Sequence, residues 1–501
     1  MALKRKLGRH SFFDAPALKA FLEDGLGDGK RDTADRHRRT IQAAAVAAAD
    51  RGLDTVDVDA IPNLPGFARE RLHKEFTLLT SSVDSTQISS DGTTKFVVLL
   101  QDGHRVESVL MRHDGGRNTL CVSSQVGCKM GCTFCATGTL GELGNLTGGE
   151  ILEQLAHARA FVAVNTSTTS EENKKTENQN PASTAVTNVV FMGMGEPLNN
   201  YDAVIGCISP MSDAKIFHVA PSRITVSTVG VVPKMLQLTK DFPEVRLALS
   251  LHAPTQALRE KIVPTATAYP LPKIMKALDT YLAAGSRQRT RAMIEYCVLG
   301  GVNDTETHAR QLGELLKGKD VIVNLIPFNP TDTPMGHLPP TYESVQAMAA
   351  VLAAPPFNHR TTVRKEMGQD IAGACGQLAL NSYGGLNKSK SSDVEDLGGA
   401  VTSKSVKGVG KQSEKPGKGT VVTARPSSSR SDAVEAPDEM RVATHHNTKT
   451  KQKVPRNIVL AVTILNTTAA VAMAVLAFAG AWKLAWYVGL FETSIPVSRE
   501  L

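Results

Sequence analysis

The sequence has almost no excess of charge outside one segment. Its 501 residues carry a formal net charge of +7, yet residues 386–456 alone hold 14 Lys and Arg against 8 Asp and Glu. The rest of the chain is therefore close to neutral. The basic character of the whole is no indication of a nucleic-acid-binding protein, and a basic surface would have to be built locally by folding.

The chain also lacks a typical secretory signal. Its opening, MALKRKLGRHSFF, is basic, but Asp14, Glu23 and Asp24 follow soon after, which suits a signal or transit peptide poorly. A framework of structural disulfide bonds is therefore not expected, although 7 cysteines are present.

Large apolar side chains are scarce over residues 386–457, where Ser, Lys, Gly, Thr and Pro dominate. Such a segment cannot bury enough surface to offset the entropy of ordering it, so we expect a disordered linker. Residues 165–185 are polar in the same way. We expect them to form a loop inserted into otherwise well-patterned sequence.

Charged side chains are absent over residues 458–482, a stretch longer than the roughly 20 residues that cross a bilayer as a helix. Four basic residues lie just before it, at 449, 451, 453 and 456, and only Lys483 lies just after. We predict a transmembrane helix here and a short tail over 483–501, with the large N-terminal part on the cytoplasmic or organelle-interior side of a membrane. A buried or surface-packed helix is the alternative, because Asn and Thr side chains interrupt the run.

Between residues 89 and 385, apolar runs typical of strands alternate with segments typical of helices. The expected strands are 187–195, 222–230, 245–253, 292–301 and 321–329, and the expected helices include 148–162, 271–285 and 307–318. Residues 95–111 are typical of a β-hairpin. Repeated strand–helix units predict an α/β domain with a parallel sheet closed or partly closed as a barrel, whose active site lies at the carboxyl ends of the strands. Residues 1–88 are expected to form a small helical accessory domain.

Three cysteines, Cys128, Cys132 and Cys135, follow the pattern C-x3-C-x2-C. This spacing brings three thiolates around one point, and three thiolates suit an iron–sulfur cluster that has one iron left open. A zinc site is the alternative, but it normally has a fourth ligand. Cys207 and Cys297 lie in apolar runs and are expected to be core residues.

The cysteine spacing resembles that of the radical S-adenosylmethionine (SAM) enzymes. Six motifs narrow the resemblance to the RlmN-type RNA methyltransferases, because they follow one another in that family's order between about residues 64 and 380. The motifs are CVSSQVGC (121–128), FMGMGEPLNN (191–200), STVG (227–230), SLHAP (250–254), NLIPFNP (324–330) and DIAGACGQL (370–378).

This resemblance implies a partial (β/α) barrel of the radical SAM type, a [4Fe-4S] cluster, SAM, and an electron donor for the cluster. It also implies methylation of carbon 2 of an adenine in large-subunit ribosomal RNA, and in some members of transfer RNA. The similar Cfr family methylates carbon 8 instead. Two alternatives from other classes are a non-catalytic iron–sulfur protein of RNA binding or ribosome assembly and an iron–sulfur electron carrier at a membrane. Neither explains the full motif set.

By the same resemblance, the three cysteines of the motif would hold the cluster. The SAM pocket would be lined by Gly195, Glu196, Ser227, Ser250, Leu251, His252 and Asn329. Each of these residues alone is as typical of a turn or a structural position as of a binding site. A carboxylate such as Glu196 is chemically suited to the ammonium group of SAM.

Three further residues would carry the chemistry that the resemblance implies. Cys375 would be methylated first, and its methyl carbon would then join the adenine. Glu107 would accept a proton, and Cys121 would attack the sulfur of Cys375, so that a disulfide forms as the product leaves. Met367 departs from the family pattern, which has a basic residue there, so a local contact to RNA or cofactor is expected to differ.

Overall fold

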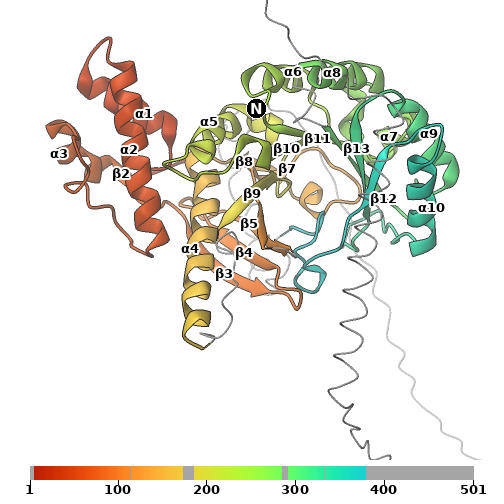
Figure 1. Ribbon diagram of the computed structural model, residues 1–501, viewed down its shortest axis with the longest axis horizontal. Helices are drawn as coiled ribbons and strands as arrows, with labels where there is room; N and C mark the ends of the chain where they lie inside the picture. The colour runs from red at the N-terminus through yellow and green to blue at the C-terminus, as the bar shows by residue number, and fades with distance from the viewer. Residues whose placement is uncertain (1–4, 114–115, 173–184, 285–291, 332, 380–501) are drawn as a thin grey trace, which may run out of the picture. The chain divides into compact units, whose positions relative to one another are not determined.

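Ten strands pair into one sheet at the centre of the computed structural model, and helices cover its outer face (Figure 1). The structure describes residues 5–113, 116–172, 185–284, 292–331 and 333–379. The strand order is β14-β13-β12-β11-β10-β9-β6-β5-β4-β3. These strands are β3 (Ser82–Ile88), β4 (Thr94–Leu99), β5 (Arg105–His113), β6 (Arg117–Cys121), β9 (Val186–Phe191), β10 (Ile224–Thr228), β11 (Arg246–Ser250), β12 (Ala292–Val298), β13 (Val321–Pro327) and β14 (Arg360–Val363).

The strands from β6 and β9 to β14 are parallel neighbours, whereas β3, β4 and β5 join the sheet in antiparallel pairs. The edges of the sheet are β14 and β3, so the barrel is only partly closed. The predicted hairpin over 95–111 and the α/β part of the predicted fold class are confirmed. Two smaller sheets pair β1 (His10–Ser11) with β2 (Phe76–Thr77) and β7 (Gln125–Cys128) with β8 (Gly141–Asn145).

Alternate residues along the parallel strands face opposite sides of the sheet, as the pleat of a strand requires. In β10, Ile224 and Val226 are fully buried in the main hydrophobic core, while Thr225 and Ser227 between and after them line cavities inside the barrel. β12 repeats this alternation, with Met293 and Glu295 lining the central cavity and Ile294 and Tyr296 fully buried in the same core. One row of side chains thus packs against the helices outside the sheet, and the other row lines the cavities inside the barrel.

The helices pack on the outer face of the sheet and on one another. They are α1 (Ala15–Leu26), α2 (Arg31–Asp50), α3 (Gly66–Glu75), α4 (Gly148–Glu172), α5 (Tyr201–Ser212), α6 (Val232–Asp241), α7 (Gln256–Ile262), α8 (Leu271–Ala284), α9 (Glu306–Leu316) and α10 (Tyr342–Ala353). In α9, the side chain of Thr305 caps the first turn, and Ala309, Leu312 and Leu316 are fully buried at helical spacing. The helices expected around 148–162, 271–285 and 307–318 are confirmed.

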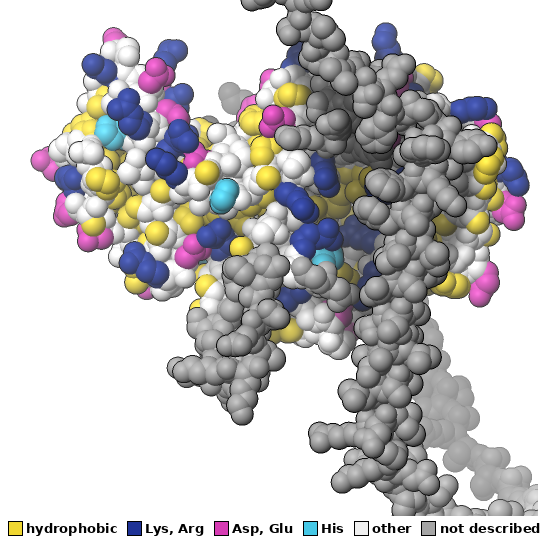
Figure 2. All heavy atoms as spheres, viewed as in Figure 1, with side chains coloured by type: hydrophobic (Ala, Val, Ile, Leu, Met, Phe, Trp, Pro, Cys, Tyr) yellow, Lys and Arg dark blue, Asp and Glu magenta, His cyan; other side chains and the backbone are white. Residues whose placement is uncertain are grey.

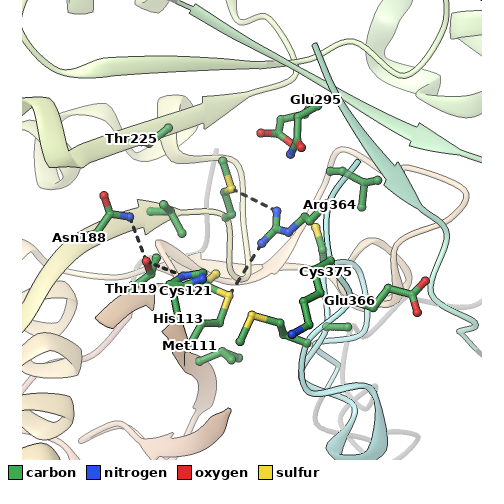
Figure 3. A pocket seen from close by; sticks show the side chains of 18 of the residues that line it. Met111, His113, Thr119, Cys121, Asn188, Thr225, Glu295, Arg364, Glu366 and Cys375 are labelled. Atoms are coloured by element: carbon green, nitrogen blue, oxygen red, sulfur yellow. Dashed lines mark hydrogen bonds between the residues drawn. The ribbon is translucent and has the colours of Figure 1, made fainter. Parts of the chain in front are cut away.

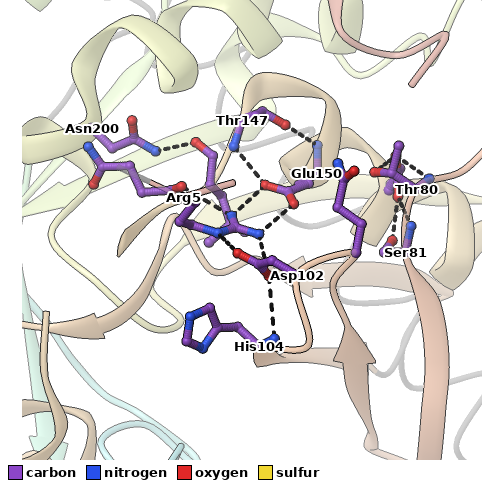
Figure 4. Close-up of polar contacts among 12 residues, drawn as sticks. Arg5, Thr80, Ser81, Asp102, His104, Thr147, Glu150 and Asn200 are labelled. Carbon is purple, nitrogen blue, oxygen red and sulfur yellow. Dashed lines mark hydrogen bonds and ion pairs between the residues drawn. The ribbon is translucent and has the colours of Figure 1, made fainter. Parts of the chain in front are cut away.

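The N-terminal region is tied to the barrel by ion pairs, of which those of Arg5 are the most buried. Arg5 donates hydrogen bonds to both carboxylate oxygens of Asp102, in the turn between β4 and β5, and to both of Glu150, in the first turn of α4 (Figure 4). Arg159 of α4 pairs with Asp50 at the end of α2, with a closest N–O distance of 2.6 Å. The domain boundaries expected at 88 and 385 stay a prediction.

The predicted membrane anchor is wrong. Among the residues that the structure describes, no helix is both long and apolar enough to cross a membrane. The longest of these helices, α2 and α4, each carry several charged side chains, which a bilayer core does not tolerate. Residues 386–457, 458–482 and 483–501 lie outside the described residues, as does the inserted segment after α4. We therefore assign neither a transmembrane helix nor a membrane-bound location to the chain.

Candidate active site

Two cavities meet inside the barrel. The larger, called the central cavity here, has a volume of about 340 Å³, and the smaller, the cysteine cavity, has a volume of about 130 Å³. The residues that line both are Met192, Glu295, Ile326, Arg364, Cys375 and Leu378. The two cavities thus share a boundary, and a group placed there can reach a molecule in either one.

The three motif cysteines line the cysteine cavity. Cys128 is the last residue of β7, and the loop after it brings Cys132 and Cys135 back toward it. Gly127 has a φ of +72°, and a Cβ at this position would lie 2.0 Å from the carbonyl oxygen of Gly141. A side chain at 127 would therefore force the start of this loop away from its partner strand. The local backbone is built to hold the three cysteines together.

The electrostatics of these cysteines suit a cationic cluster. Burial raises the pKa of Cys128 to about 12, and burial followed by the neighbouring thiols raises the pKa of Cys132. Three thiolates in such a site need a positive charge to offset them. A cluster with one open iron takes three protein thiolates, whereas a structural zinc ion normally takes four ligands, so the three cysteines fit a cluster better than one zinc ion.

The GMGEP turn after β9 brings a carboxylate to the wall of the cysteine cavity. Gly195 has a φ of +99°, and a Cβ there would lie 2.6 Å from the Cβ of Gln125, so only glycine fits. Glu196 is 3% exposed and accepts hydrogen bonds from the backbone N–H of Val229 at 2.9 Å and of Leu198 at 3.0 Å. Burial raises the pKa of this carboxyl to about 7. A cationic ligand group would stabilise its charged form.

Two serines and a histidine add hydrogen-bonding groups to the same cavity. The hydroxyl oxygens of Ser227 and Ser250, on neighbouring strands, are 3.1 Å apart. Nδ1 of His252 accepts a hydrogen bond from the backbone N–H of Cys297 at 3.0 Å, so the ring proton is on Nε2. Burial lowers the pKa of His252 to about 3, and the ring is neutral. Leu251 is fully buried and lines neither of the two cavities.

Cys375 lies on the segment that follows β14, and its side chain is exposed to the cavities. Nδ2 of Asn329 donates a hydrogen bond to the carbonyl oxygen of Cys375 at 3.2 Å. Gln369 in turn donates to Oδ1 of Asn329 at 2.8 Å, and the backbone N–H of Ala136 donates to the carbonyl oxygen of Gly376 at 2.8 Å. Asn329 thus lines the central cavity, where it holds the backbone that carries Cys375.

Cys121, the last residue of β6, lines the central cavity but not the cysteine cavity. Its side chain is 7% exposed. Figure 3 shows Cys121, Cys375 and Arg364 pointing into the central cavity from three different parts of the fold. All seven cysteines are free thiols in this structure. The three motif cysteines thus line the cysteine cavity, Cys121 lines the central cavity, and Cys375 lines both.

The chain is similar to known proteins over most of its length. Residues 122–312 match the Radical SAM superfamily. The chain is 37% identical over 378 residues to the probable dual-specificity RNA methyltransferase RlmN of Geobacillus thermodenitrificans, a match that covers 75% of this chain and 96% of that relative. A second relative with this description, from Thermotoga neapolitana, is 40% identical over 339 residues, or 66% of this chain and 91% of that protein. The chain belongs to the RlmN family.

A solved structure supports the same assignment. The crystal structure of a radical SAM methyltransferase from Sphaerobacter thermophilus matches with a TM-score of 0.60 and 34% identity, over 74% of this chain and 99% of that one. As an RlmN-family member, the chain is a SAM-dependent RNA methyltransferase of the radical SAM superfamily. Its cofactors are a [4Fe-4S] cluster and SAM, and its substrate is RNA.

Glu107, which the resemblance predicted to accept a proton, does not line either of the two cavities. It is 1% exposed on β5 and forms an ion pair with Lys95 of β4, with an N–O distance of 3.2 Å. Lys95 also donates to the carbonyl oxygen of Ala372 at 3.4 Å, on the segment that carries Cys375. Glu107 therefore lies beneath this segment, one side chain away from it.

Sequence reasoning missed two charged residues at the boundary between the cavities, Arg364 and Glu295. Arg364 directly follows β14, and Glu295 is on β12 with its side chain 3% exposed. The rule that functional residues follow the strands of a barrel could have indicated Arg364 in the sequence VRKEM. An acidic residue inside an apolar strand could have indicated Glu295. Met367, where the resemblance predicted a basic residue, also lines the central cavity.

The central cavity has a basic lining that the overall charge does not indicate. Three arginines in this lining lie at the amino ends of strands. Arg117 begins β6, Arg223 directly precedes β10, and Arg246 begins β11. Burial, followed by the charges of Arg223 and Arg117, lowers the pKa of Arg246. None of the three forms an ion pair within the described residues. On the face drawn in Figure 2, Lys and Arg side chains gather around a hollow over the barrel.

Proposed function

We propose that this enzyme methylates carbon 2 of an adenine in large-subunit ribosomal RNA, and also acts on transfer RNA, through a methylated Cys375. The observation that carries the proposal is the position of Cys375, which lines both the cysteine cavity and the central cavity. A carrier of a one-carbon group must face its donor and its acceptor in turn. Carbon 2 of adenine is not a nucleophile, so direct methyl transfer from a sulfonium is not available to it.

The cysteine cavity is the proposed cofactor site. The cluster would be held by Cys128, Cys132 and Cys135, and the Glu196 carboxylate would bind the ammonium group of SAM. Gly195, Ser227, Ser250, Leu251, His252 and Asn329 would form or support the rest of the SAM pocket. The cluster, when bound, supplies the electron that cleaves SAM reductively, and it needs an electron donor to recharge it.

The chain's own residues would carry the group through the central cavity. Cys375 would hold the methyl-derived carbon on its sulfur and deliver it to adenine. Glu107 would take up the proton that leaves carbon 2, after the segment above the Lys95–Glu107 pair moves, and the single electron that remains on the adduct would pass to the oxidised cluster. Cys121 would then attack the sulfur of Cys375, the bond from that sulfur to the carbon on adenine would break, and the carbon would keep the electron pair and take a proton. A disulfide forms, which a cellular dithiol reductant must reopen.

The basic lining supports RNA as the molecule that enters the central cavity. Arg117, Arg223 and Arg246 are suited to bind phosphate oxygens as the target nucleotide approaches. The target base must leave its stack to reach Cys375, so a loop or an extruded nucleotide is the expected form of the substrate.

The proposal is tested by the modified nucleosides of cellular RNA. RNA from cells with the protein, digested to nucleosides and analysed by mass spectrometry, should contain 2-methyladenosine that is missing from cells without it. Cells that carry only Cys375→Ala should match the cells without the protein. A difference confined to 8-methyladenosine would favour the Cfr-like alternative. No difference in either nucleoside, together with no cleavage of SAM by the anaerobically reconstituted protein, would favour a non-catalytic iron–sulfur protein.

A further inference from the structure

Arg364 is the cation that faces the two reactive thiols. It lies one residue beyond β14, and its backbone N–H donates to the carbonyl oxygen of Leu325 at 2.8 Å, which continues the pairing with β13. This bond fixes the Cα of Arg364 at the wall of the barrel. From there the side chain extends into the space between Cys121 and Cys375 (Figure 3).

The guanidinium of Arg364 has weak hydrogen-bond partners. Its side-chain N–H groups donate to the sulfur atoms of Met192 at 3.9 Å and Met111 at 4.0 Å, and within the described residues it forms no ion pair. Thioether sulfur is a weak acceptor, so these contacts hold the group in place without neutralising it. A partly buried guanidinium without a strong acceptor keeps its charge available to a group that becomes negative later.

Cys121 is such a group, because it must become a thiolate in order to attack. Burial raises its pKa to about 12, and the Cys375 thiol acts in the same direction. The only cation with an opposing effect on it, among the described residues, is Arg364. From the other side, Glu295 faces Arg364 and is held by a hydrogen bond from Nδ2 of Asn324 at 2.9 Å. Its second oxygen, Oε1, has no hydrogen-bond partner in the described chain.

We propose that Arg364 is a positioning residue for product release, which stabilises the thiolate of Cys121 as it attacks the sulfur of Cys375. This role rests on the proposed function of the two cysteines. In this role Arg364 acts through Cys121 and takes no part in the bonds that form or break. Without it, Cys121 would have to ionise in an apolar wall with no compensating charge, and the covalent RNA adduct would persist.

The ionisation of Cys121 can be measured without RNA or SAM. The full chain carrying Cys375→Ala, with its cluster reconstituted under anaerobic conditions, is treated with iodoacetamide over a range of pH, and alkylation of the Cys121 peptide is followed by mass spectrometry. Adding Arg364→Met should move the midpoint of alkylation upward by about one pH unit, which is about a tenfold lower rate at a fixed pH below the midpoint. Arg364→Lys should restore most of the rate, because it keeps the charge.

Arg246→Met is the matched control, since Arg246 lines the same cavity but begins β11, away from the thiols. It should leave the alkylation profile of Cys121 unchanged. If Arg364→Met does not fold, Arg364→Gln removes the charge with less change in polarity and is expected to give the same shift. Equal profiles with and without the charge at 364, or a Lys variant as slow as the Met variant, would overturn the proposal.

A second readout separates this inference from the function on which it rests. With RNA and SAM, Arg364→Met in the otherwise native chain should accumulate protein bound covalently to RNA, whereas Arg364→Lys should not. If the native enzyme makes no methyladenosine at all, the proposed function fails while the alkylation shift can still stand. If the native enzyme turns over and Arg364→Met shifts neither readout, the inference fails alone.

Discussion

At the scale of single residues, Cys121 is distinguished from the motif cysteines by the cavity that it faces. It lines the central cavity only, whereas Cys128, Cys132 and Cys135 line the cysteine cavity. We therefore expect Cys121→Ala to keep the absorbance of the cluster and the methylation of Cys375, and to form the RNA adduct without releasing it. Denaturing gels and mass spectrometry of the cross-linked peptide should show RNA attached through Cys375.

The control for this prediction is the double variant Cys121→Ala, Cys375→Ala. It removes the carrier sulfur, so the cross-linked species should disappear while the cluster remains. Loss of iron from Cys121→Ala, or normal turnover without trapped RNA, would contradict the division of the cysteines.

The sequence predicted the site residues that belong to motifs better than those that do not. Cys128, Glu196 and Cys375 stand in recognisable runs, and the fold places them around adjoining cavities. Arg364 and Glu295 belong to no such motif. Their importance depends on the residues that they face across the barrel, which lie far away in the sequence. The burial of Glu107 beneath the Cys375 segment also depends on contacts between β4, β5 and the C-terminal segment, which only the folded chain reveals.

At the scale of elements, the five parallel strands from β9 to β13 were predictable because each is a short apolar run with a polar end. The edge strands were not, because β3 and β14 have little buried apolar surface: Ser82–Ile88 is mostly exposed, and Arg360–Val363 alternates between exposed and half-buried positions. Their place in the sheet is set by pairing with β4 and β13 rather than by their own composition. The residues that follow β14 were therefore hard to assign to the barrel.

The turn between β3 and β4 holds the segment that carries Cys375. The carboxylate of Asp370 accepts hydrogen bonds from the Ser89 hydroxyl at 2.5 Å and from the Ser90 N–H at 3.1 Å, and Asp91 accepts one from the N–H of Gly368 at 3.0 Å. Asp370→Ala should loosen this segment and lower turnover severalfold, with cluster content unchanged. Hydrogen exchange of residues 368–378, followed by mass spectrometry, should become faster.

An exposed acidic residue on another element provides the comparison. Glu314→Ala removes an exposed partner of Lys317 on α9, and it should change neither the exchange of residues 368–378 nor turnover. Unchanged exchange in Asp370→Ala would show that the other contacts of the segment, such as that of Asn329, are sufficient to hold it.

At the scale of the whole molecule, composition was a poor guide to both charge and location. The chain outside its basic segment is nearly neutral, yet folding gathers Arg117, Arg223 and Arg246 from three strands into one cavity lining. The apolar run over 458–482 led to a membrane anchor that is not upheld. What joins the N-terminal region to the barrel was also invisible in the sequence, because the partners of Arg5 lie 97 and 145 residues away along the chain.

The ion pairs of Arg5 should make a large contribution to the stability of the fold. Replacing Arg5 by Met leaves the buried carboxylates of Asp102 and Glu150, whose side chains are 10% and 1% exposed, without their cation. Removing one partner of a buried ion pair typically lowers the free energy of unfolding by about 3–5 kcal/mol. Arg310→Met is the matched control, because Arg310 and its partner Glu306 are both exposed on α9, and a change below about 1 kcal/mol is expected.

The stability lost in Arg5→Met should depend on pH, whereas the loss from a simple packing defect would not. Burial acts to raise the pKa of Asp102, but the hydrogen bonds from Arg5 outweigh it and hold this pKa below its usual value of 3.8. The stability that Arg5 confers through Asp102 is therefore fully present above about pH 4 and is lost as the pH falls through the lowered pKa. Urea unfolding should show a large difference between the native chain and Arg5→Met at pH 7, and a smaller one in acid. A difference independent of pH would mean that Arg5 stabilises the junction by packing rather than by charge.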